Sequence, residues 1–460
     1  MKQHHDFPDN DEREVEAFVG IKPFASEKIK GIGGVYKKRY QDFIVKEMVE
    51  SGDILEMKED YPSSPFSRLT HDRFTTFNLI KVNIDTFEAT RKLSRGLNIP
   101  KHKIFYSGLK DKKAMTVQKM SIEGNHIEAL KNLDIDDMFF RCLNPTKYPV
   151  RIGDHWGNHF IITLRAIQKR ENLKRDIKQI IKTISDYGFP NYFGLQRFGT
   201  YRPNSHLVGK YLIKGEYKKA FQEYVTTTYS TEIEESQKAR RYLAENWDFK
   251  KAYKIFPKSL YYERKMIRYL IDHPDDYKGV FEVISPSLKN LIISSFQSYL
   301  FNKLISLRVD VGYSLLNPAE GDSICILEEE KGLMTKTKYI YGAKKGKYDK
   351  HLDQALELNH AAIAIPIIGY DTNMDEFPLM KSLSKKRLSN QEFGFEIFKS
   401  PLLKQLDFKG TLRLMKVKPI GLKLLELAPD EMHSGKMKLK IEFSLPKGSY
   451  ATMLLREFIK

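Results

Sequence analysis

Two stretches of the chain alternate apolar and polar residues with the period of a half-buried β-strand. They are HFIITLRAI at 159–167 and KLKIEFSL at 438–445. A third stretch, KRYQDFIVKEM at 38–48, is rich in β-branched and aromatic residues and runs into a polar loop. The pattern predicts one strand in each of the three segments.

Other stretches repeat apolar residues at the spacing of an amphipathic helix. Between about 172 and 187 the repeating side chains are Ile177, Ile180, Ile181, Ile184 and Tyr187. Gly188 follows, where a helix commonly ends. Asp85 followed by Glu88 has the form of a helix N-cap, and Gly96 stands where a C-terminal stop is expected. We therefore predict helices over 172–187 and 86–95.

The composition and the hydrophobic pattern of the sequence change near residue 211. From there to about 310 it consists of Lys-rich helical segments with many Tyr, before it becomes strand-like near 322–327. The C-terminal segment returns to the alternating strand pattern seen before residue 211, and a short helix is expected at 451–460 after a turn. Strands at both ends around a helical middle indicate an α+β domain interrupted by an insertion. The expected parts are a flexible N-terminal segment at 1–20, the first part of the α+β domain at 21–210, an insertion domain at 211–419, and the C-terminal part at 420–460.

Composition and charge narrow the function classes. The chain has 460 residues, 41% of them hydrophobic, so a sizeable core can form and disorder throughout is excluded. Lys and Arg number 77 against 59 Asp and Glu, a net charge of +18 that attracts anionic partners, with nucleic acid the leading candidate.

A membrane partner is the competing explanation of that charge. The longest apolar run, 361–368, is far shorter than the roughly 20 residues of a spanning helix. The acidic N-terminus lacks the apolar region of a secretory signal. We expect a cytoplasmic monomer with no membrane contact.

The residue types that hold metals and cofactors are sparse or badly spaced. Cys142 and Cys325 are too few for a disulfide framework or a zinc site, and we expect them to be buried thiols. The His residues show no metal-binding spacing. GIGG at 31–34 lacks the surrounding pattern of a phosphate-binding loop, so a turn is the favoured interpretation. No metal and no cofactor are expected.

The densest candidate for chemistry is YSGLKDKKAMTVQKMS at 106–121, where Asp111 stands among Lys110, Lys112 and Lys113. Neighbouring cations favour an ionised carboxylate and also attract phosphates. Taken alone, an aspartate beside Gly108 is more typical of a solvated turn.

Two further segments combine residue types that suit RNA binding or a packed core. NYFGLQRFG at 191–199 places three aromatic residues, an amide pair and Arg197 between glycines. Composition does not decide between a core strand edge and a surface on which bases stack. FSLPKGSYATMLLRE at 443–457 has an ordinary turn and terminal helix as its simplest interpretation.

At these three segments the sequence resembles the TruD family of tRNA pseudouridine synthases. GLKDKKAMTVQ is similar to the family's catalytic motif, NYFGLQRFG to its second motif, and LPKGSYATMLLRE to its C-terminal motif. Weaker agreements lie at VYKKRYQDFIVKE, RIGDHWGNHFIITLR and SFQSYLFNKL. The resemblance covers residues from about 30 to 460, and the three motifs stand in the family's order.

The resemblance implies a pseudouridine synthase fold, a mixed and largely antiparallel sheet with flanking helices, interrupted by a TruD-specific α/β insertion domain. It implies that uridine in tRNA, at position 13, becomes pseudouridine, with Asp111 as the nucleophile acting on a flipped-out base. Phe193 is the implied stacking residue, and Asn191 and Lys37 the implied substrate-binding residues. Lys38 and Arg39 are alternatives to Lys37, and a loop hydrogen bond is an alternative role for Asn191. The expected RNA contacts are Lys110, Lys112, Lys113 and Arg197.

Two other functions fit the charge. A non-catalytic RNA-binding or chaperone module would keep the fold and the charge, and loss of Asp111 would have marked that outcome. An RNA methyltransferase is disfavoured because no convincing glycine-rich cofactor loop follows a strand.

Overall fold

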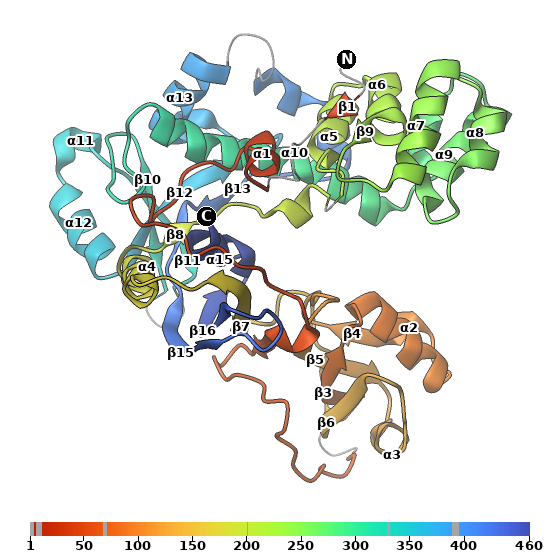
Figure 1. Ribbon diagram of the computed structural model, residues 1–460, viewed down its shortest axis with the longest axis horizontal. Helices are drawn as coiled ribbons and strands as arrows, with labels where there is room; N and C mark the ends of the chain where they lie inside the picture. The colour runs from red at the N-terminus through yellow and green to blue at the C-terminus, as the bar shows by residue number, and fades with distance from the viewer. Residues whose placement is uncertain (1–3, 6–11, 68–70, 200, 329–331, 389–394) are drawn as a thin grey trace. The chain divides into compact units, whose positions relative to one another are not determined.

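The computed structural model describes residues 4–5, 12–67, 71–199, 201–328, 332–388 and 395–460. The chain forms two compact units, each assembled from segments that are distant in the sequence (Figure 1). Unit 1 comprises Met1–Phe24, Pro190–Leu327 and Met334–Lys416. Unit 2 comprises Ala25–Phe189, Glu328–Leu333 and Val417–Lys460.

Unit 2 is built on an eight-stranded sheet with the strand order β15-β16-β7-β2-β5-β3-β6, in which β4 also pairs with β5. β2 and β5 run parallel, and the other neighbouring pairs are antiparallel. The sheet is therefore mixed and largely antiparallel, as predicted. Its strands are β2 (Phe43–Met48), β3 (Phe74–Val82), β4 (Ile104–Tyr106), β5 (Met115–Glu123), β6 (Met138–Thr146), β7 (Gly157–Gln168), β15 (Ile420–Pro429) and β16 (Lys436–Pro446).

Three helices of unit 2 begin and end within one residue of the predicted ranges, and a fourth, of five residues, was not predicted. Asp85 caps its helix by accepting a hydrogen bond from the Glu88 amide, at 2.8 Å. Gly188 has φ +79°, a conformation that glycine adopts without strain, and it ends the helix predicted over 172–187. The helices are α2 (Thr86–Gly96), α3 (Ile127–Lys131), α4 (Leu173–Tyr187) and α15 (Ala451–Ile459).

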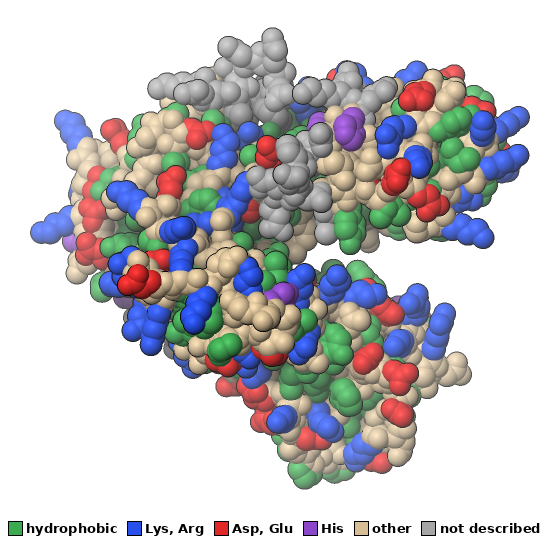
Figure 2. Space-filling model, in the orientation of Figure 1, with side chains coloured by type: hydrophobic (Ala, Val, Ile, Leu, Met, Phe, Trp, Pro, Cys, Tyr) green, Lys and Arg blue, Asp and Glu red, His purple; other side chains and the backbone are tan. Residues whose placement is uncertain are grey.

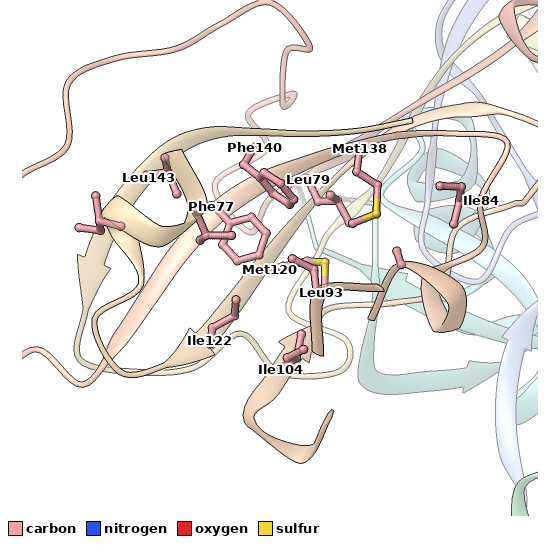
Figure 3. Close-up of a cluster of buried hydrophobic side chains, with 13 residues drawn as sticks. Phe77, Leu79, Ile84, Leu93, Ile104, Met120, Ile122, Met138, Phe140 and Leu143 are labelled. Carbon is pink, nitrogen blue, oxygen red and sulfur yellow. The ribbon is translucent and has the colours of Figure 1, made fainter. Parts of the chain in front are cut away.

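A hydrophobic core fills the space between α2, α3 and one face of strands β3, β5 and β6 (Figure 3). Phe77 and Leu79 of β3 and Met120 of β5 are fully buried in it, together with Leu93 of α2. Side chains on a strand alternate between the two faces of the sheet, so residues 77, 79 and 81 of β3 share the face that α2 covers. Lys81 therefore continues this apolar row.

Unit 1 is mainly helical, as predicted for the middle of the chain. The 25-residue helix α10 (Pro286–Asp310) lies at its centre and packs against α5 (Ser205–Ile213), α13 (Pro378–Leu388) and β12 (Ala361–Ile367). A Cβ at Gly209 of α5 would lie 2.4 Å from a carbonyl oxygen of α10, so the close approach of the two helices requires glycine. The other helices are α1 (Glu12–Phe18), α6 (Tyr217–Phe221), α7 (Glu234–Asn246), α8 (Phe249–Ile255), α9 (Tyr261–Asp272), α11 (Ala343–Gly346), α12 (Asp349–Glu357) and α14 (Pro401–Gln405).

Unit 1 also contains an antiparallel four-stranded sheet with the order β11-β10-β12-β13. Its strand β10 confirms the strand expected near 322–327. The strands are β10 (Ser323–Leu327), β11 (Met334–Ile340), β12, and β13 (Thr411–Leu414). Among the described residues of this unit, β1 (His4–His5) also pairs with β9 (Thr228–Tyr229). The remaining described strands, β8 (Phe189–Pro190) and β14 (Lys416–Val417), pair with each other.

The structure differs from the sequence-based expectations at two places near the N-terminus. The strand expected from residue 38 begins only at Phe43, because Tyr40–Asp42 form a 3-10 turn whose Asp42 carboxylate accepts from the Arg39 amide. No element was expected before residue 20, whereas residues 12–18 form α1. This helix forms because Val15 packs on Tyr229.

Several smaller expectations can be compared with the described residues. Cys142 and Cys325 are both free and buried, as predicted. No helix within the described ranges is long and apolar enough to cross a membrane. On the face shown in Figure 2, Lys and Arg side chains are spread over both units, with Asp and Glu among them.

His206 of α5 makes the free energy of unfolding of unit 1 depend on pH. Its ring stacks on Tyr299 with centroids 4.6 Å apart and meets Phe18 and Phe198 edge-on. Burial lowers the pKa of this imidazole to about 3. In the unfolded chain this imidazole has a pKa of about 6.5. Between pH 6.5 and pH 3 the unfolded chain therefore binds a proton that the folded protein does not, so the free energy of unfolding falls as the pH falls.

We predict that His206→Phe removes this contribution. In chemical unfolding of unit 1, the loss of unfolding free energy on acidification from pH 6 to 4 should be smaller in the variant, by about 1.4 kcal/mol per pH unit. The exposed His351, which lies in the same unit, supplies the control, and His351→Phe should leave the slope unchanged. Equal slopes in wild type and His206→Phe would contradict a neutral buried imidazole.

Candidate active site

Asp111 lies on the loop between β4 and β5 in unit 2. Its Oδ2 is 3.2 Å from the Lys37 ammonium, and the two side chains are 39% and 18% exposed. The structure thus brings together two of the predicted site residues, and it selects Lys37 over its neighbours as the partner of Asp111.

Lys37 is held in place by its backbone and by an aromatic ring. It has φ +58°, the left-handed region that a lysine rarely adopts. Its ammonium also lies 4.1 Å from the centre of the buried Phe43 ring, a cation–π contact. The Lys37 ammonium is therefore a fixed, oppositely charged partner for the Asp111 carboxylate.

Three adjacent strands hold this loop with polar side chains on one face of the sheet. β2 contributes Glu47, β5 contributes Gln118 and β3 contributes Lys81. The strand registers pair Val45 with Thr116 and Thr116 with Lys81, which places all three side chains on the face that α2 covers. All three are buried.

Lys81 binds the backbone of the loop. Its ammonium donates to the carbonyl oxygens of Ile84 at 2.5 Å, Asp111 at 3.0 Å and Lys110 at 3.4 Å. Lys81 has no exposed surface, and burial lowers its pKa to about 8. At neutral pH it therefore remains a cation beneath the loop.

Glu47 binds the loop through a side chain. The Lys110 ammonium lies 2.6 Å from Glu47 Oε2, with 3% and 1% of the two side chains exposed. Glu47 Oε1 also accepts from the Lys119 amide at 3.1 Å. The residue directly before Asp111 thus points into the protein, away from a position where it could contact a phosphate in solvent.

Thr86 and Gln118 complete the attachment. The Lys110 amide donates to Thr86 Oγ1 at 3.0 Å, and that hydroxyl donates to Gln118 Oε1 at 3.1 Å. Gln118 Nε2 donates to the Gly108 carbonyl at 3.3 Å. These bonds join the loop to the first residue of α2 and to β5.

The C-terminal motif reaches the start of the same loop through one intermediate residue. Lys447 Nζ donates to the Gly153 carbonyl at 2.8 Å, and the Gly153 amide donates to the Ser107 carbonyl at 2.8 Å. Farther along the motif, Glu457 accepts hydrogen bonds from the amides of residues 25 and 26, each at 3.0 Å. The motif therefore organises unit 2 around the loop.

A cavity of about 240 Å³ lies beside the loop in unit 2. Ser107 and His155 line it, and burial lowers the pKa of the His155 imidazole. The ring also limits the loop, because a Cβ at Gly108 would lie 3.0 Å from His155 Cε1.

The second motif belongs to unit 1. Its Asn191 is buried, and the side-chain amide makes two hydrogen bonds: Oδ1 accepts from Arg413 at 2.8 Å, and Nδ2 donates to the Leu414 carbonyl at 3.0 Å. Arg413 also donates to the Asn191 carbonyl at 3.0 Å. The amide of Asn191 thus fixes the position of Arg413.

Phe193 is a nearly buried ring surrounded by cations. It is 8% exposed, and the guanidinium groups of Arg413 and Arg197 lie 4.1 and 5.6 Å from its centre. Its backbone is bracketed by Asn302, which accepts from the Phe193 amide at 2.9 Å and donates to its carbonyl at 3.0 Å. A base can stack here only where these arginines leave a ring face open.

The remaining predicted RNA contacts occupy different environments. Lys112 and Lys113 are exposed, and Lys112 pairs with Glu88 of α2 at 3.2 Å. Arg197 is half-buried, and its Nε donates to the Ser298 hydroxyl at 3.1 Å.

Sequence reasoning missed Lys81, Glu47 and Arg413. Two of them left a signal. Glu47 shares the buried face of its strand with Phe43 and Val45, and Lys81 continues the apolar row of β3. A charged residue at a core-facing position is rare unless it is paired, which marks such positions for attention.

No group of three or more His, Cys, Asp or Glu side chains in the described parts of the chain is arranged to hold a metal ion. The cations around Asp111 are instead lysine side chains.

We predict that Glu47→Gln destabilises unit 2, because it leaves the Lys110 ammonium buried without a counter-charge. Breaking a buried pair from one side costs about 3 to 5 kcal/mol. Chemical unfolding of the variant should show this loss. Glu56, whose half-exposed carboxylate pairs with Lys46, supplies the matched control, and Glu56→Gln should cost less than about 1 kcal/mol. Equal stabilities of the two variants would contradict the role of the pair.

Comparisons with known proteins agree with the resemblance seen in the motifs. A family model described as tRNA pseudouridine synthase D (TruD) matches residues 18–458. A Methanosarcina mazei protein named "Probable tRNA pseudouridine synthase D" is 34% identical, over 97% of this chain and 98% of that protein. A Thermococcus sibiricus protein of the same name is 30% identical, over 94% and 96%.

The fold agrees as well. A crystal structure from Methanosarcina mazei, titled "Putative tRNA pseudouridine synthase D (TruD)", matches with a TM-score of 0.76 at 32% identity, over 97% of this chain and 98% of that chain. Since both the sequence and the fold match over nearly their whole length, this chain belongs to the TruD family of tRNA pseudouridine synthases.

Proposed function

We propose that this protein converts uridine to pseudouridine at position 13 of tRNA, with Asp111 as the nucleophile. The observation that carries the proposal is the 3.2 Å ion pair between Asp111 and Lys37 on a loop held by buried side chains. The pair supplies an ionised carboxylate with a fixed direction of approach, which nucleophilic catalysis requires. The 39% exposure of Asp111 leaves it open to a substrate.

The reaction is an isomerisation. The bond between N1 and C1′ breaks, C5 bonds to C1′, the C5 proton leaves and N1 gains a proton. Asp111 forms a transient bond either to C1′ of the ribose or to C6 of the uracil, and it is released when the product forms. The atoms balance without a redox partner, so the chain's own residues have to bind, orient and exchange protons.

A base in folded RNA has to be extruded before it can react, at a cost of a few kcal/mol. We assign Phe193 to receive it by stacking. Asn191 acts on that ring indirectly, because its amide holds Arg413, which lies 4.1 Å from the ring centre. This assignment replaces a direct substrate contact of the Asn191 side chain.

We assign unit 2 as the catalytic domain, because it holds Asp111, Lys37 and the mixed sheet. Unit 1 then corresponds to the insertion domain, with the boundaries predicted at residues 210 and 419 moved to Pro190 and Lys416.

The phosphates of tRNA are the partners of the exposed cations. We propose Lys112 and Lys113, which follow Asp111 directly, as phosphate contacts, together with Arg197. Lys110 has a different role in the proposal: it anchors the loop to Glu47. A net charge of +18 adds a long-range attraction for the polyanion.

We predict that Asp111→Asn abolishes pseudouridine formation while the protein still folds and binds tRNA. The change preserves size but removes the nucleophile, so turnover should fall at least a thousandfold. The measurement is single-turnover conversion of uridine 13 in unmodified tRNA, with affinity from filter binding.

Asp53, an exposed residue of the same unit, provides the matched control as Asp53→Asn, which should retain wild-type turnover. Turnover of Asp111→Asn within tenfold of wild type would refute the assignment. A non-catalytic RNA-binding protein would bind tRNA but convert none in any variant.

We predict that Phe193→Leu lowers turnover about tenfold to a hundredfold and weakens tRNA binding much less. Stacking on an aromatic side chain is worth about 1 to 3 kcal/mol per base, whereas the phosphate contacts remain. Phe198→Leu tests the alternative, because Phe198 is a buried aromatic residue of the same motif. Equal effects of the two variants on stability, with normal turnover of the folded fraction, would make Phe193 a core residue.

A further inference from the structure

Lys81 has an unusual position for a lysine. It lies on the apolar face of β3, in the same row as Phe77 and Leu79, and none of its surface is exposed. Burying an ammonium is costly unless hydrogen bonds replace the lost water. All three donors that a lysine offers are matched by the carbonyl oxygens of Ile84, Lys110 and Asp111.

These three acceptors belong to two segments. Ile84 stands just before the N-cap of α2, while Lys110 and Asp111 belong to the loop. The ammonium therefore ties the loop to the start of α2. Two consecutive carbonyls accept from one cation, so the orientation of the Asp111 backbone is fixed. This also fixes the direction in which the Asp111 side chain leaves the backbone.

We propose that Lys81 is a positioning residue for the reaction, whose buried ammonium holds the Lys110 and Asp111 carbonyls so that the Asp111 carboxylate stays in reach of Lys37 and the substrate. This inference rests on the proposed role of Asp111. The hydrogen bonds of Lys81 go to backbone carbonyls and not to the Asp111 carboxylate, so Lys81 acts on the reaction through the backbone of the loop.

The charges around Lys81 allow its protonation to be followed. The carboxylates of Asp111 and Asp85 favour its charged form, whereas burial, the larger effect, and Lys110 oppose it. Lys37 partly offsets the Asp111 charge through the ion pair. With a pKa of about 8, the ammonium is present at neutral pH and lost progressively above pH 8.

The first test measures positioning without any reaction. In Lys81→Met, amide hydrogen exchange of the peptide covering 107–114 should speed up about tenfold or more, because the loop carbonyls lose their anchor. Lys46→Met is the matched control: Lys46 is a mostly buried lysine of β2 that pairs with Glu56 instead of the loop. If Lys81→Met does not fold, Lys81→Gln, which keeps an amide donor, replaces it.

The second test measures turnover. The kcat of Lys81→Met on tRNA should fall about tenfold to a hundredfold, since small misplacements of a reacting group have effects of this size, while KM changes less than threefold. The ratio of the wild-type to the variant single-turnover rate should also decrease above pH 8. Ionisation of the RNA affects both proteins and cancels in this ratio.

Faster loop exchange together with lower kcat supports the inference. Unchanged loop exchange overturns it, and so does faster exchange with wild-type kcat. Failure of the proposed function is recognised separately, because Asp111→Asn would then retain turnover whatever Lys81→Met does. A wild-type-to-variant rate ratio that stays constant from pH 7 to 9.5 would also count against the ammonium.

Discussion

The constraint on which unit 2 depends is that a buried charge must find partners inside the protein. Lys81 and Glu47 project from adjacent parts of the sheet into a space that is otherwise filled by an apolar core. Both find their partners in the loop after β4, one through backbone carbonyls and the other through the Lys110 ammonium. Leaving either charge unpaired would be costly, so these contacts hold the loop in one position although the loop is not part of a strand.

The same constraint acts in unit 1 with different residue types. Asn191 and Arg413 are both buried, and each satisfies the other, so the arginine is held close to the Phe193 ring. Asn302, in the middle of α10, meets both backbone groups of Phe193. In both units, buried polar side chains hold a residue of a family motif in place. A motif therefore marks the position of a site without telling which of its residues touch the substrate.

The sequence predicted well those features that depend on neighbours along the chain. The Asp85 cap, the end of a helix at Gly188 and the strands at 159–167 and 438–445 are determined by local hydrogen bonding and periodicity, and the structure confirms them. It failed where a contact joins distant residues. Helix α1 forms because Val15 meets Tyr229, more than 200 positions away. The late start of the strand predicted from residue 38 has a local cause instead: the Arg39 amide donates to the Asp42 carboxylate, a turn that the strand pattern does not reveal. The hydrogen bonds of Lys81 could not be predicted either, because its partners are carbonyls of a loop about 30 positions further along the chain.

The lysines around Asp111 illustrate this limit. In the sequence, Lys110, Lys112 and Lys113 form one basic cluster around a carboxylate, and nothing in their identity separates them. In the structure these lysines differ in their exposure to solvent: Lys110 is buried against Glu47, whereas Lys112 and Lys113 face solvent. The lysine that pairs with Asp111 is the half-buried Lys37, which comes from another segment. Charges in water are screened and pair weakly, whereas a partly buried pair keeps more of its attraction. Among these four lysines it is therefore Lys37, named only by resemblance, that has both the proximity and the burial needed to pair with Asp111, while the Asp111 side chain stays 39% exposed.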